Sequence, residues 1–268
     1  MILMKKVSLV FMAFAMVTGL TACGDKVTIS AEKRTNSEVP KETKKYVIAT
    51  NTYFAPFEFQ NDLGEYVGID MDLLDAIAKD QGFTYETVKM PFNEVLTAVE
   101  EGRVDGALAG ISITDERREK LDFSDPYLEG GVVMAVAATR QDINNYEDLA
   151  GKTVAVAVAR GTEAEAFAQS IKDIYNFKIT TFNEFSDVYI DVLEGNSQAL
   201  FEDYPVMGYI ISRGVDFKIV SDIERKSPYG FAVPKGKNQE LLEMFNKGLK
   251  NLKENGKYQE IMDTYVQS

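Results

Sequence analysis

Residues 110–127 read GISITDERREKLDFSDPY, and this stretch carries more information on the fold than any other part of the chain. Ser112 and Thr114 stand at the end of a short predicted strand, and Asp115 can cap the turn that follows. Arg117 falls in the first helical turn after that cap. Hydroxyls, free backbone N–H groups and a guanidinium in one place favour a site for a small carboxylate, because arginine offers two parallel donors and a helix start adds favourable partial charge. The alternative is an ordinary surface turn with a solvated arginine.

Strands and helices are predicted to alternate on both sides of this stretch. Before it, the apolar periodicity predicts strands at 46–50, 83–88 and 104–109, a helix that begins at Asp70 and a helix at 92–100. After it, the periodicity predicts strands at 153–158, 178–182 and 198–201, and helices at 163–175, 184–193, 204–213, 239–255 and 258–265. Such alternation implies βαβ units, and hence largely parallel sheets with helices on both faces.

Two extended pieces are interpreted as paired crossovers between two lobes. One is the long apolar stretch at 130–138, and the other lies at 229–234, before the terminal helices. The expected lobes are therefore 46–133 with 230–268 for lobe 1, and 134–229 for lobe 2. Two lobes joined by two strands leave a cleft that can close by hinge motion, and ligands of open α/β sheets lie beyond the carboxyl ends of the strands.

The N-terminal residues have the pattern of an export signal. Lys5 and Lys6 precede an apolar run at 7–20, which is too short and too interrupted for a convincing transmembrane helix. The run ends in LTAC at 20–23, which resembles a bacterial lipobox. We expect residues 1–22 to be a signal peptide and Cys23, the single cysteine, to carry a diacylglycerol anchor with further acyl chains such as palmitate.

A polar stretch follows the expected anchor. Residues 24–45 contain no aromatic side chain and no sustained apolar period, so 23–45 is expected to be a lipidated, disordered tether. Beyond residue 45 the chain has 21 Lys and Arg against 38 Asp and Glu, a net charge of −17. A domain this acidic is not expected to bind nucleic acid or an anionic lipid surface.

Three further segments, together with residues 110–127, resemble a known family. They read GIDMD at 68–72, RGTE at 160–163 and EDYP at 202–205. The four segments are similar to those of the family 3 extracellular solute-binding proteins, the amino-acid receptors of ABC importers, and in particular of the glutamine-binding members. The resemblance extends over 46–267 and implies a two-lobe α/β fold of the type II periplasmic-binding-protein kind, with two mostly parallel sheets, flanking helices and a two-strand hinge. It also implies that Arg117 binds the α-carboxylate of the ligand.

The residues around Arg117 are expected to complete its site. Gly110 has no Cβ, so its backbone N–H or carbonyl can approach a ligand closely. Ser112 is expected to add N–H and hydroxyl donors to the carboxylate beside Arg117. The neighbouring Arg118 points about 100° away on a helix and is expected to be solvated.

Three earlier residues match positions around the ligand side chain in the glutamine-binding members. Phe54 and Phe92 match aromatic rings that stack on the ligand, although most phenylalanines in a chain of this size belong to the core. Asn51 stands where the glutamine receptor has an aspartate. The resemblance therefore leaves the side-chain specificity open.

Lobe 2 is expected to supply the remaining contacts. Arg160, Gly161 and Thr162 lie at a strand-to-helix turn, whose N–H groups suit carboxylate oxygens, although Arg160 can equally be a solvated loop residue. Asp203 matches the aspartate that binds the ligand's α-ammonium group in the family. The alternative for Asp203 is an N-cap of the helix at 204–213.

The GIDMD segment is interpreted as scaffold. Asp70 is predicted to be the N-cap of the helix that it opens. Asp72 is predicted to be a first-turn carboxylate that interacts favourably with the helix dipole.

The expected function is capture of a polar L-amino acid, with glutamine favoured, by a lipid-anchored receptor on the extracytoplasmic face of the cell membrane. A monomer is expected, with the permease and ATPase of an ABC importer as partners, contact with the membrane through the lipid anchor alone, and no nucleic acid. No enzyme activity, cofactor or metal is expected, because the chain has no histidine and no cysteine besides Cys23. The alternatives are an amino-acid-sensing lipoprotein without transport and, less favoured, a dehydratase-type enzyme on the same fold.

Overall fold

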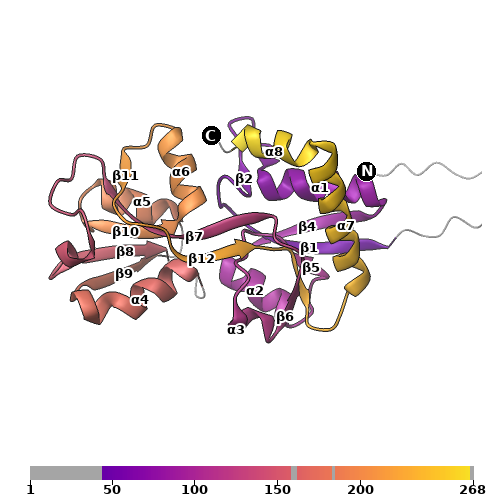
Figure 1. The fold of residues 1–268 in the computed structure, drawn as a ribbon, viewed down its shortest axis with the longest axis horizontal. Helices are drawn as coiled ribbons and strands as arrows, with labels where there is room; N and C mark the ends of the chain where they lie inside the picture. The colour runs from indigo at the N-terminus through magenta and orange to yellow at the C-terminus, as the bar shows by residue number, and fades with distance from the viewer. Residues whose placement is uncertain (1–43, 158–161, 183–184, 266–268) are drawn as a thin grey trace, which may run out of the picture. The chain divides into compact units, whose positions relative to one another are not determined.

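The computed structural model describes residues 44–157, 162–182 and 185–265 (Figure 1). The expected signal peptide and tether with Cys23, and the pocket candidates Arg160 and Gly161, lie outside the described residues. The described residues form two main sheets with flanking helices, and a small sheet of β2 (Phe59–Gln60) and β3 (Tyr66–Val67). Within them, no helix combines the length and the apolar character needed to cross a membrane.

The first sheet consists of five strands, which in spatial order are β4 (Thr84–Met90), β1 (Lys45–Asn51), β5 (Gly106–Ala107), β13 (Ala232–Pro234) and β6 (Leu121–Phe123). Strand β1 runs parallel to β4 and β5, whereas β13 runs antiparallel to β5 and β6. Ile48 and Ala49 of β1 point to opposite faces, as successive strand residues must. Ile48 packs in a buried cluster with helices α1 (Ile69–Gln81), α7 (Gln239–Asn255) and α8 (Lys257–Tyr265), and Ala49 in one with α2 (Phe92–Glu100). The sheet is therefore covered by helices on both faces (Figure 1).

The second sheet consists of six strands: β11 (Phe217–Ile219), β7 (Leu128–Ala137), β10 (Ala199–Asp203), β8 (Thr153–Ala157) and β9 (Lys178–Phe182) in spatial order, with β12 (Glu224–Tyr229) paired to β7. Strand β8 is parallel to β9 and β10, and β7 is antiparallel to its neighbours. Met134 of β7 packs with α4 (Glu163–Tyr175) and with the 3-10 helix η1 (Tyr146–Leu149). Val133 packs on the other face with α5 (Phe185–Leu193) and α6 (Tyr204–Ser212).

Strands β7 and β12 form the link between the two sheets. Leu128 pairs with Tyr229 at one end of this ribbon, and Val132 with Glu224 near the other. The boundary expected after residue 133 falls inside β7, and the one expected after residue 229 falls at the end of β12. The return crossover, predicted at 229–234, is in fact β12, because 232–234 is β13 of the first sheet. The sequence ERKSPY of β12 is polar and contains a proline, so it lacks the apolar pattern that indicates a strand.

Two predicted helix caps are wrong by a residue or two. Helix α1 begins at Ile69, so its N-cap is Gly68 and Asp70 lies inside the first turn. Gly68 has φ +139°, and a Cβ there would lie 2.1 Å from the Phe57 carbonyl oxygen, so only glycine fits. Helix α3 (Asp115–Arg118) is capped by Thr114, whose Oγ1 accepts a hydrogen bond from the Arg117 N–H at 3.3 Å.

Candidate functional site

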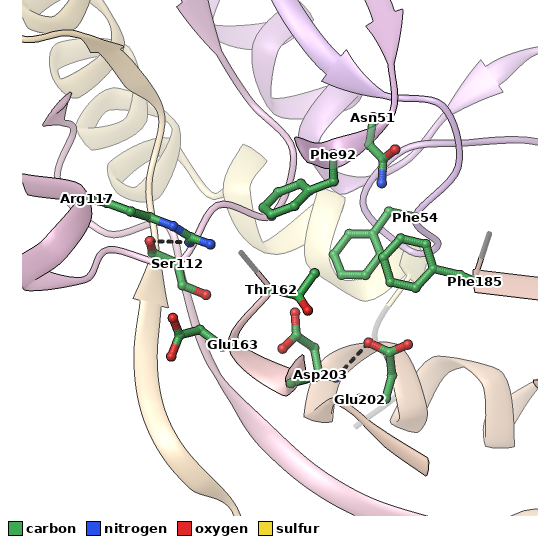
Figure 2. Close-up of a pocket in the computed structure, with 12 residues that line it drawn as sticks. Asn51, Phe54, Phe92, Ser112, Arg117, Thr162, Glu163, Phe185, Glu202 and Asp203 are labelled. Atoms are coloured by element: carbon green, nitrogen blue, oxygen red, sulfur yellow. Dashed lines mark hydrogen bonds between the residues drawn. The ribbon is translucent and has the colours of Figure 1, made fainter. Parts of the chain in front are cut away.

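A pocket lies between segments of the first and second sheets (Figure 2). Six of its lining residues lie at the end of a strand of the first sheet or in the segments that connect its strands: Asn51, Phe54, Phe92, Gly110, Ser112 and Arg117. The other six come from the second: Thr162, Glu163, Ala164, Phe185, Glu202 and Asp203. Every residue proposed from the sequence that lies in the described part of the chain therefore lines one pocket. Whether each contacts a ligand stays a prediction.

Arg117 forms a cationic wall of this pocket. It lies in the single turn of α3 and is 7% exposed. Its Nη1 donates a hydrogen bond to the Ser112 carbonyl oxygen at 2.7 Å, and its guanidinium carbon lies 5.6 Å from the centre of the Phe92 ring. Burial lowers the pKa of Arg117, while the carboxylates of Glu163 and Asp203 raise it. The guanidinium stays charged, because an arginine pKa starts far above neutrality, and it extends toward the pocket (Figure 2).

Asp203 approaches the pocket from the opposite side. It ends β10 and occupies the N-cap position of α6, yet its side chain makes no capping hydrogen bond. The alternative expected from the sequence, that the Asp203 side chain caps this helix, is therefore wrong. Burial raises the pKa of Asp203 to about 6, although the Tyr229 hydroxyl and the Arg117 guanidinium lower it. The group is thus mainly ionised at neutral pH.

Glu202 is a second acid beside Asp203, with a different environment. It is 2% exposed, and its Oε2 accepts a hydrogen bond from the Tyr189 hydroxyl at 2.8 Å. Its Oε1 accepts one from the Asp203 N–H at 2.8 Å. Burial and the neighbouring Asp203 charge raise the pKa of Glu202 to about 8. Glu202 is therefore mainly protonated at neutral pH, and the two acids together carry about one negative charge.

Aromatic rings form another part of the pocket wall. The rings of Phe54 and Phe185 have centroids 5.1 Å apart, and Phe54 also stacks on Phe57 at 5.4 Å. Gly110 packs directly against Phe54: its φ is +55°, and a Cβ would lie 2.7 Å from the Phe54 ring. Any residue larger than glycine at position 110 would therefore displace that ring.

Asn51 presents an unsatisfied donor to the pocket. Its side-chain carbonyl oxygen accepts a hydrogen bond from the Thr52 N–H at 2.7 Å, which fixes the orientation of the amide. The side chain is buried, and its Nδ2 has no hydrogen-bond partner among the described residues. Figure 2 shows this nitrogen directed toward Phe54 and the pocket. A buried amide N–H₂ without an acceptor is unfavourable, so a ligand oxygen would be well placed there.

The sequence patterns do not assign a role in the pocket to four of its residues, Glu202 among them. Glu163 and Ala164 directly follow Thr162, whose Oγ1 caps α4 by accepting from the Glu165 N–H at 3.2 Å. Ala164 is the residue that directly follows the RGTE motif at 160–163. Phe185 begins α5, and a single phenylalanine at a helix start gives no signal that separates a pocket wall from the core.

Comparison with known proteins shows the family to which the chain belongs. Residues 46–268 match the bacterial extracellular solute-binding proteins, family 3. The chain is 31% identical over 259 residues to the arginine-binding extracellular protein ArtP of Bacillus subtilis, a match that covers 96% of each chain.

Two solved structures share the fold. Substrate binding domain 2 of Lactococcus lactis GlnP, in an open conformation, is 39% identical, with 85% of this chain and 97% of that chain covered and a TM-score of 0.61. An ancestral arginine-binding protein bound to glutamine is 34% identical, with 84% and 98% covered and a TM-score of 0.75. The expected type II periplasmic-binding-protein fold is therefore confirmed, and the chain belongs to family 3 of the bacterial extracellular solute-binding proteins.

Proposed function

We propose that the protein binds an L-amino acid in the pocket between its two sheets. Arg117 would bind the α-carboxylate, with the N–H and hydroxyl of Ser112 beside it, and Asp203 would bind the α-ammonium group. The observation that carries this proposal is that a buried cation and a partly buried anion, from segments of different sheets, line the same pocket. A zwitterionic ligand presents a carboxylate to the cation and an ammonium group to the anion.

We propose glutamine as the preferred ligand. The free Nδ2 of Asn51 suits the carbonyl oxygen of a side-chain amide, and the mainly protonated Glu202 does not supply a full negative charge for a cationic side chain. Phe54, Phe92 and Phe185 would contact the methylene groups in between. Arginine is the main competitor, because relatives of comparable identity are named for arginine.

The pocket also suits closure around the ligand. Lobe 1 would comprise 46–133 and 230–268, and lobe 2 134–229, with β7 and β12 as the hinge. Arg117 and Asp203 belong to different lobes in this division, so a zwitterion that contacts both would favour the closed form. Thr162 and, outside the described residues, Arg160 and Gly161 would add lobe 2 contacts to the ligand.

We further propose that the protein is a lipoprotein of an ABC importer. Removal of residues 1–22 would expose Cys23 for lipidation, 23–45 would be the tether, and the folded part would deliver its ligand to a permease on the extracytoplasmic face. Family membership and the extracellular protein ArtP among the relatives support this location. Binding rather than catalysis is favoured, since the matching family is one of binding proteins and the chain has no histidine.

The experiment is a thermal-shift screen of the folded part with glutamine, arginine, histidine, glutamate, asparagine and cystine. A ligand that binds only the folded state raises the melting temperature, and the rise grows with ligand concentration relative to Kd. We expect the largest shift with L-glutamine and none with D-glutamine. Arg117→Ala should abolish the shift, while Arg118→Ala at the exposed neighbouring position should retain it. No shift with any amino acid at millimolar concentration would contradict the proposed function.

A further inference from the structure

Two carboxyl groups lie behind the pocket wall, outside the residues that line it. Glu58 and Asp70, which we call the acid pair, are both 0% exposed. Asp70 Oδ2 accepts a hydrogen bond from the Gly110 N–H at 2.8 Å. Glu58 is joined to Phe54 through its backbone, since the Phe54 N–H donates to the Glu58 carbonyl at 2.6 Å and the Glu58 N–H donates to the Phe54 carbonyl at 3.1 Å. Each acid is therefore one hydrogen bond away from a pocket residue.

Hydroxyl and carboxyl groups surround the acid pair. Tyr127 and the Glu58 carboxyl lie beside Asp70, and Tyr66 of β3 faces both acids. The ring of Tyr229 on β12 lies 6.3 Å from the Tyr127 ring, centre to centre, and Tyr229 lies near Asp203 of the pocket. Among the described residues, neither acid takes part in an ion pair. A cation near Tyr66 is Lys89 of β4, whose ammonium group lies 3.4 Å from the centre of the Tyr66 ring.

The surroundings of the acid pair do not suit two negative charges. Neither oxygen of Glu58, nor Oδ1 of Asp70, has a hydrogen bond of ordinary geometry, although the Asn51 N–H lies near Glu58 and the Tyr127 hydroxyl lies near Asp70. Two buried carboxylates without a cation would repel each other and lose their hydration. A proton held by Glu58 removes one charge and gives Asp70 a donor. In agreement with this, burial raises the pKa of Glu58 well above its ordinary value and that of Asp70 to about 7.

We propose that Glu58 and Asp70 are positioning residues that share a proton, hold Phe54 and Gly110 in place, and weaken ligand binding when that proton is lost. This inference rests on the proposed function, because it concerns the wall of the same pocket. Loss of the proton would drive the two carboxylates apart or admit water between them. Phe54 and Gly110 are closely packed, since a Cβ on Gly110 would lie 2.7 Å from the Phe54 ring. The wall would therefore move as one piece.

The test compares the pH dependence of ligand affinity in matched variants. The Kd of L-glutamine and of L-arginine is measured by calorimetry at pH 6.5 and 8.5 for the wild type, Glu58→Gln, Asp70→Asn and Glu65→Gln. Glu202, Asp203 and the ligand amine titrate in all four proteins, so the difference between their profiles reports the acid pair. Glu65 is exposed and lies between β2 and β3, close in the sequence to Glu58. It is therefore the control for loss of an acid.

We expect the ratio of Kd at pH 8.5 to Kd at pH 6.5 to be about threefold or more larger in the wild type and Glu65→Gln than in Glu58→Gln and Asp70→Asn. An amide in place of one acid leaves a single carboxyl group with no second negative charge beside it, so the pH dependence should be smaller. Equal ratios in all four proteins would overturn the proposal.

A second measurement does not depend on the ligand. The infrared carbonyl band of a protonated carboxyl group should be present at pH 7.5 in the wild type and reduced in Glu58→Gln, and an unchanged band would also overturn the proposal. If neither amino acid binds the wild type at pH 6.5, the proposed function has failed. The infrared result then shows, independently of any ligand, whether the acid pair holds a proton.

Discussion

Arg117 and Asp203 interact electrostatically across the pocket. Arg117 lies in α3, beside the first sheet, and Asp203 is the last residue of β10 in the second sheet. The Asp203 carboxylate raises the pKa of Arg117, and the Arg117 guanidinium lowers that of Asp203. In each case burial acts in the opposite direction and has the larger effect. The two charges therefore lie close enough to interact, and a ligand with a carboxylate and an ammonium group could contact both.

Replacement of Asp203 by asparagine should weaken amino-acid binding by about tenfold or more, because a hydrogen bond to a charged group contributes roughly 1.5–3 kcal/mol. Calorimetric titration of the variant with L-glutamine gives the comparison. The fold should be unaffected, since the Asp203 side chain makes no capping hydrogen bond. Asp216→Asn, at a position just before β11 of the same sheet, is the control and should bind as the wild type does. An unchanged affinity in Asp203→Asn would remove this residue from the site.

Replacement of Asn51 by aspartate should change which amino acid is preferred. The carboxylate keeps the acceptor for the Thr52 N–H but replaces the free Nδ2 donor with an acceptor. Glutamine affinity should fall by about tenfold, and arginine affinity should rise, because a guanidinium offers donors only. Competition between the two amino acids in one titration measures the ratio directly. Asn93→Asp, exposed on α2 beside Phe92, adds the same charge outside the pocket and should leave the ratio unchanged.

The candidate site could be predicted from the sequence largely because its residues stand in short motifs at element ends. Thr162 and Asp203 each stand near the end of a strand, and the carboxyl ends of parallel strands meet at one edge of a sheet. Phe185 and the Asn51 amide orientation could not be predicted in this way. The role of Phe185 depends on contact with Phe54, a residue distant in the sequence, and the amide orientation depends on a backbone donor.

The fold was predictable where apolar periodicity is strong and not where it is interrupted. Helix α4 has the predicted bounds, and so does β9. The polar strand β12 was not recognised, because its pairing with β7 rather than its own composition makes it a strand. Asp70 resembled an N-cap, but Gly68 takes that position, since the close approach of the Phe57 carbonyl excludes a Cβ.

Replacement of Gly110 by alanine should reduce both stability and affinity. The positive φ is unfavourable for alanine, and the new Cβ would lie 2.7 Å from the Phe54 ring, so we expect a loss of about 1–3 kcal/mol in the free energy of unfolding. Gly214→Ala is the matched control, since Gly214 has φ +84° and a Cβ at that position would enter open space. Chemical denaturation and glutamine titration of both variants separate backbone strain from contact with Phe54. Equal affinity in the two variants would show that Phe54 does not shape the ligand site.

The stability of the folded state should decrease as the pH rises from mildly acidic to mildly alkaline values. Burial raises the folded-state pKa values of Asp203, Asp70 and Glu202 to about 6, 7 and 8, whereas carboxyl groups in an unfolded chain titrate near a pH of about 4. The unfolded chain therefore releases these protons first, so the stabilisation is complete below a pH of about 4 and is lost as the pH rises through the folded-state values.

Glu202→Gln isolates one part of this dependence. Glutamine has no proton to release, so the fall in melting temperature between pH 5.5 and 9 should be smaller in this variant than in the wild type. Tyr189 and the Asp203 N–H can still donate to the amide oxygen, which preserves part of the local hydrogen bonding. Glu194→Gln, at an exposed position before β10, should follow the wild-type curve. If Glu202→Gln loses as many degrees as the wild type, Glu202 is ionised in the folded protein, and its negative charge would then be available to a cationic ligand side chain.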